Sequence, residues 1–231
     1  MQQYDWWYDD RRQVGLDFED EQQVATYDAR QGGSADWDRS LLQGLGLGSE
    51  MRMADIGCGT GILVCEAAKI CREATGIDVS KAMLRTAAAR ASGLGLSNLT
   101  FQNAGFLTFE AAEGGFDLVT SKAALHHLPD FWKALAIARI REALRPGGLF
   151  YLRDVMFCEP PQHLASAAET WISNLVARSG YAREDGVSHI RDEHTTFTWV
   201  IQRMLVEAGF QVRRHTHEGN STGVFVAERV G

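Results

Sequence analysis

A glycine-rich run that begins with an acidic residue, Asp-Ile-Gly-Cys-Gly-Thr-Gly at 55–61, constrains this chain more than any other feature. Residues 51–54 lead into it as a short buried strand would, and residues 62–68 continue as the first turns of a helix. Glycines have no Cβ atom, so the backbone of the run can turn sharply and approach a ligand closely. The helix start adds free N–H groups and a partial positive charge. A strand, a glycine turn and a helix in this order predict a nucleotide-type pocket.

The glycine spacing separates this loop from the dinucleotide fingerprint. That fingerprint is Gly-x-Gly-x-x-Gly, whereas here the third glycine comes one residue early and Ile62 takes the expected position. Asp55 lies two residues before Gly57, where a carboxylate would repel a pyrophosphate and attract an ammonium group. The loop therefore favours a cofactor with adenosine at one end and an amino acid at the other over NAD.

A second acidic residue, Asp78, follows the short apolar run 74–77. It lies about 20 residues after Gly57, where a second parallel strand is expected to end. A carboxylate at that position can accept two hydrogen bonds from ribose hydroxyls. Asp78 is therefore predicted to hold the ribose of the cofactor.

Strands and helices alternate through the middle of the chain. Strands are predicted at 51–56, 74–78, 99–103, 116–121 and 149–155, with helices at 61–71, 81–92 and 130–144 between them. This alternation predicts a parallel sheet with both faces covered. In the tail, a helix is predicted at 196–208, and two strands at 211–217 and 223–229 are joined by so short a link that they must be antiparallel.

Further blocks in register identify a family resemblance. They are Asn103-Ala104, residues 116–121, Leu125-His126-His127-Leu128, and Leu144-Arg145-Pro146-Gly147-Gly148. With the glycine loop and Asp78, they make the chain resemble class I S-adenosylmethionine-dependent methyltransferases, and among them the ubiquinone and menaquinone biosynthesis enzymes. The resemblance implies a Rossmann-like α/β fold, with a seven-stranded, mostly parallel sheet, an antiparallel last strand and helices on both faces. It also implies S-adenosyl-L-methionine as the cofactor and S-adenosyl-L-homocysteine as its product.

The expected cofactor residues come from the glycine loop, the strand ends and the segments that follow them. They are Tyr27, Asp55, Gly57, Cys58, Gly59, Gly61, Asp78, Val79, Met83, Asn103, Ala104, Gly105, Phe106 and Ser121. Asn103 stands where the resemblance leads us to expect an aspartate that contacts the adenine amino group. Its side-chain carbonyl can still accept that hydrogen bond.

The candidate catalytic residues are His126, His127 and Asp154. The two histidines follow the fourth strand, where one could act as a general base or both could only hold the loop. Asp154 ends the fifth strand and could orient an acceptor or cap the segment that follows. No metal is expected, because no further zinc ligands are evident at suitable positions. The polar group at 189–194 is interpreted as a substrate-facing loop or a solvated connector.

Two segments lie outside the alternating core. Residues 1–50 are expected to form an N-terminal cap or lid, and residues 51–231 the methyltransferase domain with a substrate-side insert at 157–194. The insert is expected to include a helix at 164–177. The aromatic cluster at 4–8 could close over an apolar substrate or pack the N-terminal segment onto the core.

Composition excludes some classes of function. The net charge is −7 and no run of lysine and arginine stands out, which disfavours nucleic-acid binding through phosphate neutralisation. The four cysteines form no Cys-x-x-Cys pair and are expected to be reduced thiols in a cytoplasmic protein. The longest uncharged stretch, 91–109, is broken by polar residues, so no membrane span is expected.

The expected activity is methyl transfer to a small-molecule acceptor by direct in-line displacement. Oxygen is the first choice of acceptor atom, followed by nitrogen or carbon. The expected partner is that small molecule, and a homodimer is considered as well. The alternatives are an RNA or tRNA methyltransferase and a non-catalytic cofactor-binding scaffold.

Overall fold

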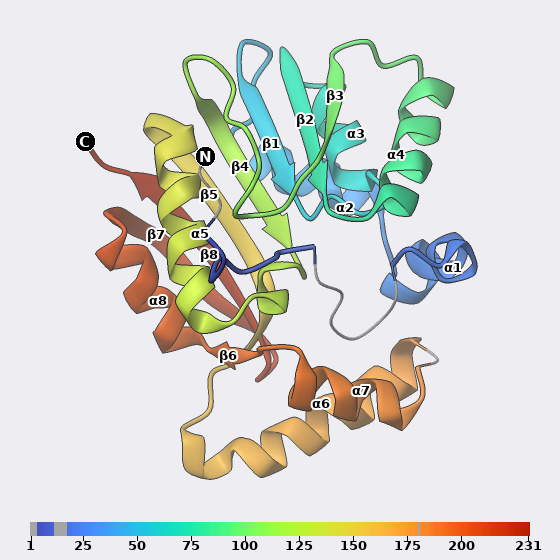
Figure 1. Ribbon diagram of the computed structural model, residues 1–231, viewed down its shortest axis with the longest axis vertical. Helices are drawn as coiled ribbons and strands as arrows, with labels where there is room; N and C mark the ends of the chain where they lie inside the picture. The colour runs from blue at the N-terminus through green and yellow to red at the C-terminus, as the bar shows by residue number, and fades with distance from the viewer. Residues whose placement is uncertain (1–3, 12–17, 180) are drawn as a thin grey trace.

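The computed structural model describes residues 4–11, 18–179 and 181–231, and its centre is a mixed β-sheet (Figure 1). In these residues, seven strands pair in the order β3-β2-β1-β4-β5-β8-β7, and the two-residue strand β6 pairs with β5. The strands are β1 Arg52–Ile56, β2 Glu73–Asp78, β3 Leu99–Asn103, β4 Phe116–Lys122, β5 Leu144–Phe157, β6 Thr196–Phe197, β7 Phe210–Glu218 and β8 Thr222–Arg229. The predicted fold class is confirmed.

The first strands of the sheet are parallel and end at the same edge. β1 pairs with β2 on one side and with β4 on the other, and β2 pairs with β3. Asp55 lies beside Gly76, and Asp78 lies beside Asn103. The loops that leave β1, β2 and β4 therefore meet at one edge, which is where ligands bind in open α/β sheets.

Helices cover both faces of this sheet (Figure 1). On one face, α2 Ala35–Gly44 and α3 Ile62–Ala68 bury residues such as Leu42 and Val64. On the other face, α5 Asp130–Ala143 and α8 Thr198–Glu207 bury residues such as Ile137 and Leu205. Because the sheet is covered on both faces, consecutive residues of the central strands β1 and β4 are buried, not only every second residue.

The end of the chain forms the antiparallel part of the sheet. β8 runs antiparallel to both β5 and β7, with Tyr151 opposite Val226 and Leu152 opposite Phe225. This insertion of the last strand between two others confirms the predicted antiparallel last strand.

Some boundaries differ from those expected. β5 begins at Leu144, directly after α5, so Pro146-Gly147-Gly148 lies within the strand instead of before it. Asp130 is the first residue of α5 rather than its cap, and its carboxylate accepts from Lys133 Nζ at 2.8 Å. The N-cap is Pro129, whose side chain makes no hydrogen bond. Ser80, in contrast, caps α4 Lys81–Gly93 as predicted, accepting from Met83 N at 3.0 Å.

Three further helices lie on the side of the carboxyl ends of the parallel strands (Figure 1). They are α1 Glu21–Gln31, α6 Leu164–Ser179 and α7 Arg183–Asp192, and the short helices η1 Leu125–His127 and η2 Pro161–His163 precede α5 and α6. α6 and α7 pack against each other. Among the described residues, no helix combines the length and apolar character needed to cross a membrane.

Candidate functional site

The glycine turn after β1 lies across the end of β2. Gly57 has a positive φ of 76°, and its N–H donates to the Ile77 carbonyl at 2.8 Å. Gly59 N donates to Asp78 Oδ2 at 2.8 Å. A Cβ at position 57 would overlap the Ala124 Cβ, so this close approach of two loops requires glycine.

Asp78 is the last residue of β2, and its carboxylate lies between the glycine turn and the turn after β2. Besides Gly59 N, it accepts from Ser80 N at 2.9 Å, which orients the carboxylate. Burial raises the pKa of Asp78, and the backbone hydrogen bonds to Ser80 and Gly59 oppose that rise. The carboxylate is therefore fixed by the backbone of two loops while it also lines a cavity.

This first cavity has a volume of about 100 Å³ and follows the ends of β1, β2 and β3. The predicted cofactor residues that line it are Tyr27, Gly57, Gly59, Asp78, Val79, Met83, Ala104, Gly105 and Phe106. Its walls are mostly apolar apart from the Asp78 carboxylate, the His127 ring and two N-terminal residues. Such a cavity suits a flat aromatic group joined to a polar sugar.

The N-terminal segment supplies lining residues that sequence reasoning missed. Asp10, Arg11 and Phe18 line the first cavity. Asp10 accepts from Leu107 N at 2.7 Å, and Arg11 donates to the Asn103 carbonyl at 3.1 Å. These residues belong to no motif and follow no helical or strand period, so the sequence gives no signal for their contacts.

A second cavity of about 450 Å³ lies on the other side of the glycine turn. The predicted residues Tyr27, Asp55, Gly57, Cys58 and Gly59 line it. Asp55 is 3% exposed and accepts from Thr120 Oγ1 at 2.7 Å. Burial raises the pKa of Asp55 to about 6, although the Thr120 hydrogen bond lowers it.

Charged and aromatic side chains close the far wall of the second cavity. Lys122 forms an ion pair with Asp38 and lies 5.1 Å from the centroid of the Trp37 ring. Arg153 lies 6.0 Å from the same ring. Both signs of charge therefore line one cavity, as a zwitterionic ligand requires.

Three predicted cofactor residues lie behind the linings of these cavities in the described structure: Gly61, Asn103 and Ser121. A Cβ at Gly61 would come within 2.8 Å of the Ala87 Cβ, so this glycine allows α3 to pack against α4. The Asn103 amide donates to the Val79 carbonyl at 2.8 Å and positions the turn after β2. Ser121 is fully buried in β4.

A third cavity of about 280 Å³ lies between the core and the pair of helices α6 and α7. The candidate catalytic residues His126 and His127 line it, together with Tyr27 from α1. From the insert come Trp171, Tyr181, His189 and Glu193, among others. Glu193 was not among the candidate catalytic residues, although its spacing of four residues from His189 is one helical turn.

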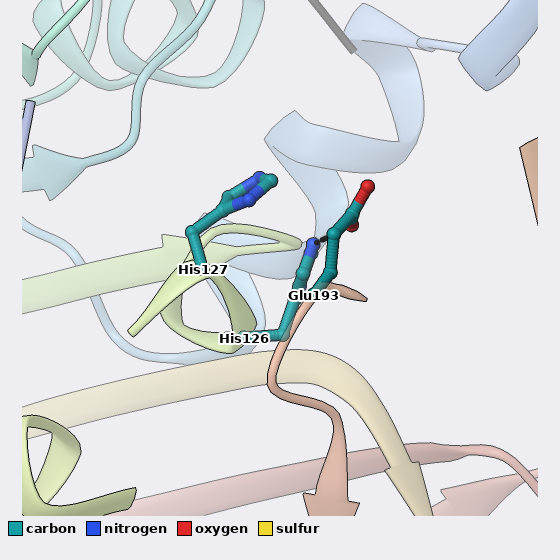
Figure 2. Close-up of side chains that lie close together, drawn as sticks. All are labelled: His126, His127 and Glu193. Atoms are coloured by element: carbon teal, nitrogen blue, oxygen red, sulfur yellow. Dashed lines mark ion pairs between the residues drawn. The ribbon is translucent and has the colours of Figure 1, made fainter. Parts of the chain in front are cut away.

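His126 is held between two carboxylates, those of Asp154 and Glu193, and Figure 2 shows the second of them. Its Nδ1 lies 2.5 Å from Asp154 Oδ1, its backbone N donates to Asp154 Oδ2 at 3.1 Å, and its Nε2 lies 3.2 Å from Glu193 Oε2. Burial disfavours the charged form of the ring and lowers the pKa of His126. The negative charges and hydrogen bonds of Asp154 and Glu193 have the larger effect and raise this pKa to about 9. The ring is then an imidazolium at neutral pH, with no lone pair to take a proton.

His127 is the neutral member of the pair. Burial and the charge of His126 lower the pKa of His127 to about 3. Its ring lies 5.8 Å from the Phe18 ring, and it lines both the first and the third cavity. His127 therefore stands where the two cavities meet. Asp154 is buried at the end of β5 and, through its contacts, orients His126.

Comparison with known proteins identifies the family. Residues 47–203, more than half of the chain, match the family model described as a methyltransferase domain. The chain belongs to this family. This is the family of class I S-adenosylmethionine-dependent methyltransferases that the sequence motifs predicted.

Relatives of this methyltransferase match parts of it. An uncharacterized methyltransferase of Mycobacterium bovis is 34% identical over 127 residues, 53% of this chain and 61% of that protein. A ubiquinone biosynthesis O-methyltransferase of Methylococcus capsulatus is 34% identical over 160 residues, 69% of this chain and 65% of that one. The chain thus spans less than two thirds of either relative. The crystal structure of the Bacillus subtilis YcgJ protein has a TM-score of 0.66 at 16% identity over 85% of this chain and 99% of that chain, which shows the fold.

Proposed function

We propose that this methyltransferase transfers the methyl group of S-adenosyl-L-methionine to an oxygen of a small-molecule acceptor. Nitrogen and carbon are the next choices of acceptor atom. The observation that carries the proposal is that three cavities adjoin one another along one sheet edge, since Tyr27 and Ala123 line all of them. The Methylococcus capsulatus relative, named as an O-methyltransferase, supports oxygen.

The first two cavities would hold the two ends of the cofactor. Adenosine would occupy the first cavity, with its ribose hydroxyls on Asp78 and its adenine beside Phe106. The amino-acid end would occupy the second cavity, where Asp55 balances the ammonium group. The sulfonium would then lie near Tyr27 and face the third cavity, which would hold the acceptor.

Methyl transfer needs an aligned nucleophile and the exclusion of water more than it needs further chemistry. The neutral His127, at the junction of the first and third cavities, would accept a hydrogen bond from an acceptor hydroxyl and so orient its oxygen. Asp154 and the charged His126 would act as positioning residues, because they fix the η1 turn that carries His127.

The open third cavity favours an enzyme over a non-catalytic scaffold, whose acceptor site would be filled by side chains. Arg153 lines it among histidines and carboxylates, which is not the basic groove that RNA binding needs. The cytoplasmic location, the homodimer and the division into a cap and a core domain stay predictions.

The affinity for S-adenosyl-L-methionine is expected to fall about tenfold between pH 7 and pH 5. Asp55, with its pKa raised to about 6, gains a proton in this range and then attracts the ammonium group less. Calorimetric titration at both pH values measures the change. Asp55→Asn should bind weakly at both and lose most of the dependence, and an equal pH dependence in this variant would contradict the role of Asp55.

Titration of the purified chain with S-adenosyl-L-methionine, S-adenosyl-L-homocysteine and NAD tests the proposed function. We expect one site for the first two ligands and no binding of NAD. Incubation with methyl-labelled donor and a panel of phenols, carboxylic acids and amines should then label an acceptor and release S-adenosyl-L-homocysteine. Binding of NAD in place of the sulfonium cofactor would overturn the proposal.

A further inference from the structure

Three side chains from two distant parts of the chain bring metal-binding atoms together in the third cavity. His126 and His127 come from the η1 turn, and Glu193 comes from the segment between α7 and β6 (Figure 2). One ligand atom of each lies within 4.8 Å of the other two. From these contacts we propose that His126, His127 and Glu193 form a binding site for a divalent transition-metal ion such as Zn²⁺.

The spacing of these atoms suits such an ion. Zinc binds nitrogen and carboxylate oxygen at about 2.0–2.2 Å, which places the ligand atoms of a tetrahedral site about 3.4 Å apart. His126 Nε2 and Glu193 Oε2 are 3.2 Å apart. The ligand atom of His127 lies within 4.8 Å of the other two, and its ring centroid is 4.3 Å from that of His126, so the set closes around an ion when the three side chains draw together.

The neighbours of the cluster have the arrangement usual around a bound metal. Metal-binding histidines generally donate their second ring N–H to a carboxylate, which fixes the tautomer and the ring orientation. Asp154 occupies this place for His126, with its carboxylate 2.5 Å from Nδ1, so that Nε2 faces Glu193. His189 Nδ1 lies 2.5 Å from Glu193 Oε2 and orients that carboxylate.

The competing interpretation is a hydrogen-bonded network that only ties the insert to the core. That network requires His126 to carry a proton on both ring nitrogens, since each faces a carboxylate. A divalent cation on Nε2 would displace the proton on that nitrogen and leave the Nδ1 proton on Asp154, adding one unit of positive charge next to Glu193. Two imidazoles and one carboxylate select a transition ion over Mg²⁺ or Ca²⁺, which prefer oxygen ligands.

A metal ion at this site would also restrict the class of acceptor, and this part of the inference rests on the proposed function. With three protein ligands, a bound ion keeps a position for a further ligand, as in catalytic zinc sites. This position would face the third cavity, so an acceptor with a phenol or carboxylate oxygen fits best. A metal ion lowers the pKa of an oxygen that it binds, so a bound acceptor would ionise without His127 as a base.

Titration of the chelator-treated chain with Co²⁺, followed by visible absorption, tests the site directly. We expect one ion per chain and the intense bands of a four- or five-coordinate complex, displaced by Zn²⁺. His127→Ala and Glu193→Gln should each weaken binding by at least about tenfold. The matched control is His163→Ala, which removes an exposed histidine near Glu159 and should leave Co²⁺ binding unchanged.

Binding of S-adenosyl-L-homocysteine by each variant separates this proposal from the proposed function and checks the fold. Glu193→Gln is expected to keep cofactor affinity, since Glu193 lines neither of the first two cavities. The metal proposal is overturned if the chain binds no Co²⁺. It is also overturned if variants that still bind the cofactor bind Co²⁺ as tightly as the parent. Neither outcome would affect the assignment of methyl transfer.

Discussion

Replacing Asp78 with alanine is expected to weaken the binding of S-adenosyl-L-methionine by about 100-fold or more. The carboxylate is placed to accept two hydrogen bonds from ribose hydroxyls, and each hydrogen bond to a charged group contributes about 1.5–3 kcal/mol. Losing both costs at least about 3 kcal/mol, which corresponds to about 100-fold in affinity. Asp78→Ala also leaves Gly59 N and Ser80 N without their present partner, so the glycine turn loses support.

Two comparison variants make this measurement specific. Asp78→Asn keeps the size of the side chain and one acceptor oxygen, so its affinity should fall between those of Asp78→Ala and the parent. Asp36→Ala removes an acidic side chain that is 91% exposed at the start of α2, and it should bind the cofactor normally. Calorimetric titration gives all four affinities. Parent-like binding by Asp78→Ala would show that the ribose lies elsewhere.

Gly57→Ala is expected to destabilise the fold by about 3 kcal/mol and to abolish cofactor binding. A residue with a Cβ is strained at a φ of 76°, at a cost of about 1–2 kcal/mol. The new Cβ would also overlap the Ala124 Cβ, which forces the two loops apart. Urea denaturation measures the loss of stability, and titration with S-adenosyl-L-homocysteine measures the loss of binding.

The chain offers a control for each part of this effect. Gly46 has a φ of 79° and no atom within 4 Å of an added Cβ, so Gly46→Ala has the strain without the overlap. Its stability should fall by only about 1–2 kcal/mol. Adding Ala124→Gly to Gly57→Ala removes the overlap and should recover part of the stability. If Gly57→Ala and Gly46→Ala lose equal stability, the close approach of the two loops is not the cause.

Much of the fold could be predicted because local patterns carry it. The alternation of apolar runs and helical segments predicted the parallel strands, and the short link after β7 predicted the antiparallel end. Asp78 could be placed at the end of the second strand because the number of residues between it and Gly57 is that of one helix and one strand. The helices α1 and α2 were missed, although Asp20 and Ser34 cap them with hydrogen bonds to Gln22 N and Trp37 N.

The acceptor side of the site could not be predicted in the same way. Glu193 meets His126 only because α7 folds back over the carboxyl ends of the strands, and no periodic pattern records that contact. No metal was expected because the sequence showed no further zinc ligands at suitable positions, and Glu193 lies far from the two histidines along the chain. Asp154 was left with two roles because its partner, the His126 ring, becomes evident only when β5 lies beside β4.

A crystal structure of the chain with S-adenosyl-L-homocysteine tests the central claim most directly, namely that the glycine turn and its two carboxylates shape a site for this cofactor. The account predicts ribose hydroxyls within hydrogen-bond distance of Asp78 and the ammonium group near Asp55. It also predicts that the thioether sulfur faces the third cavity beside Tyr27. A cofactor bound away from the glycine turn, or its orientation with the amino-acid end on Asp78, would contradict it.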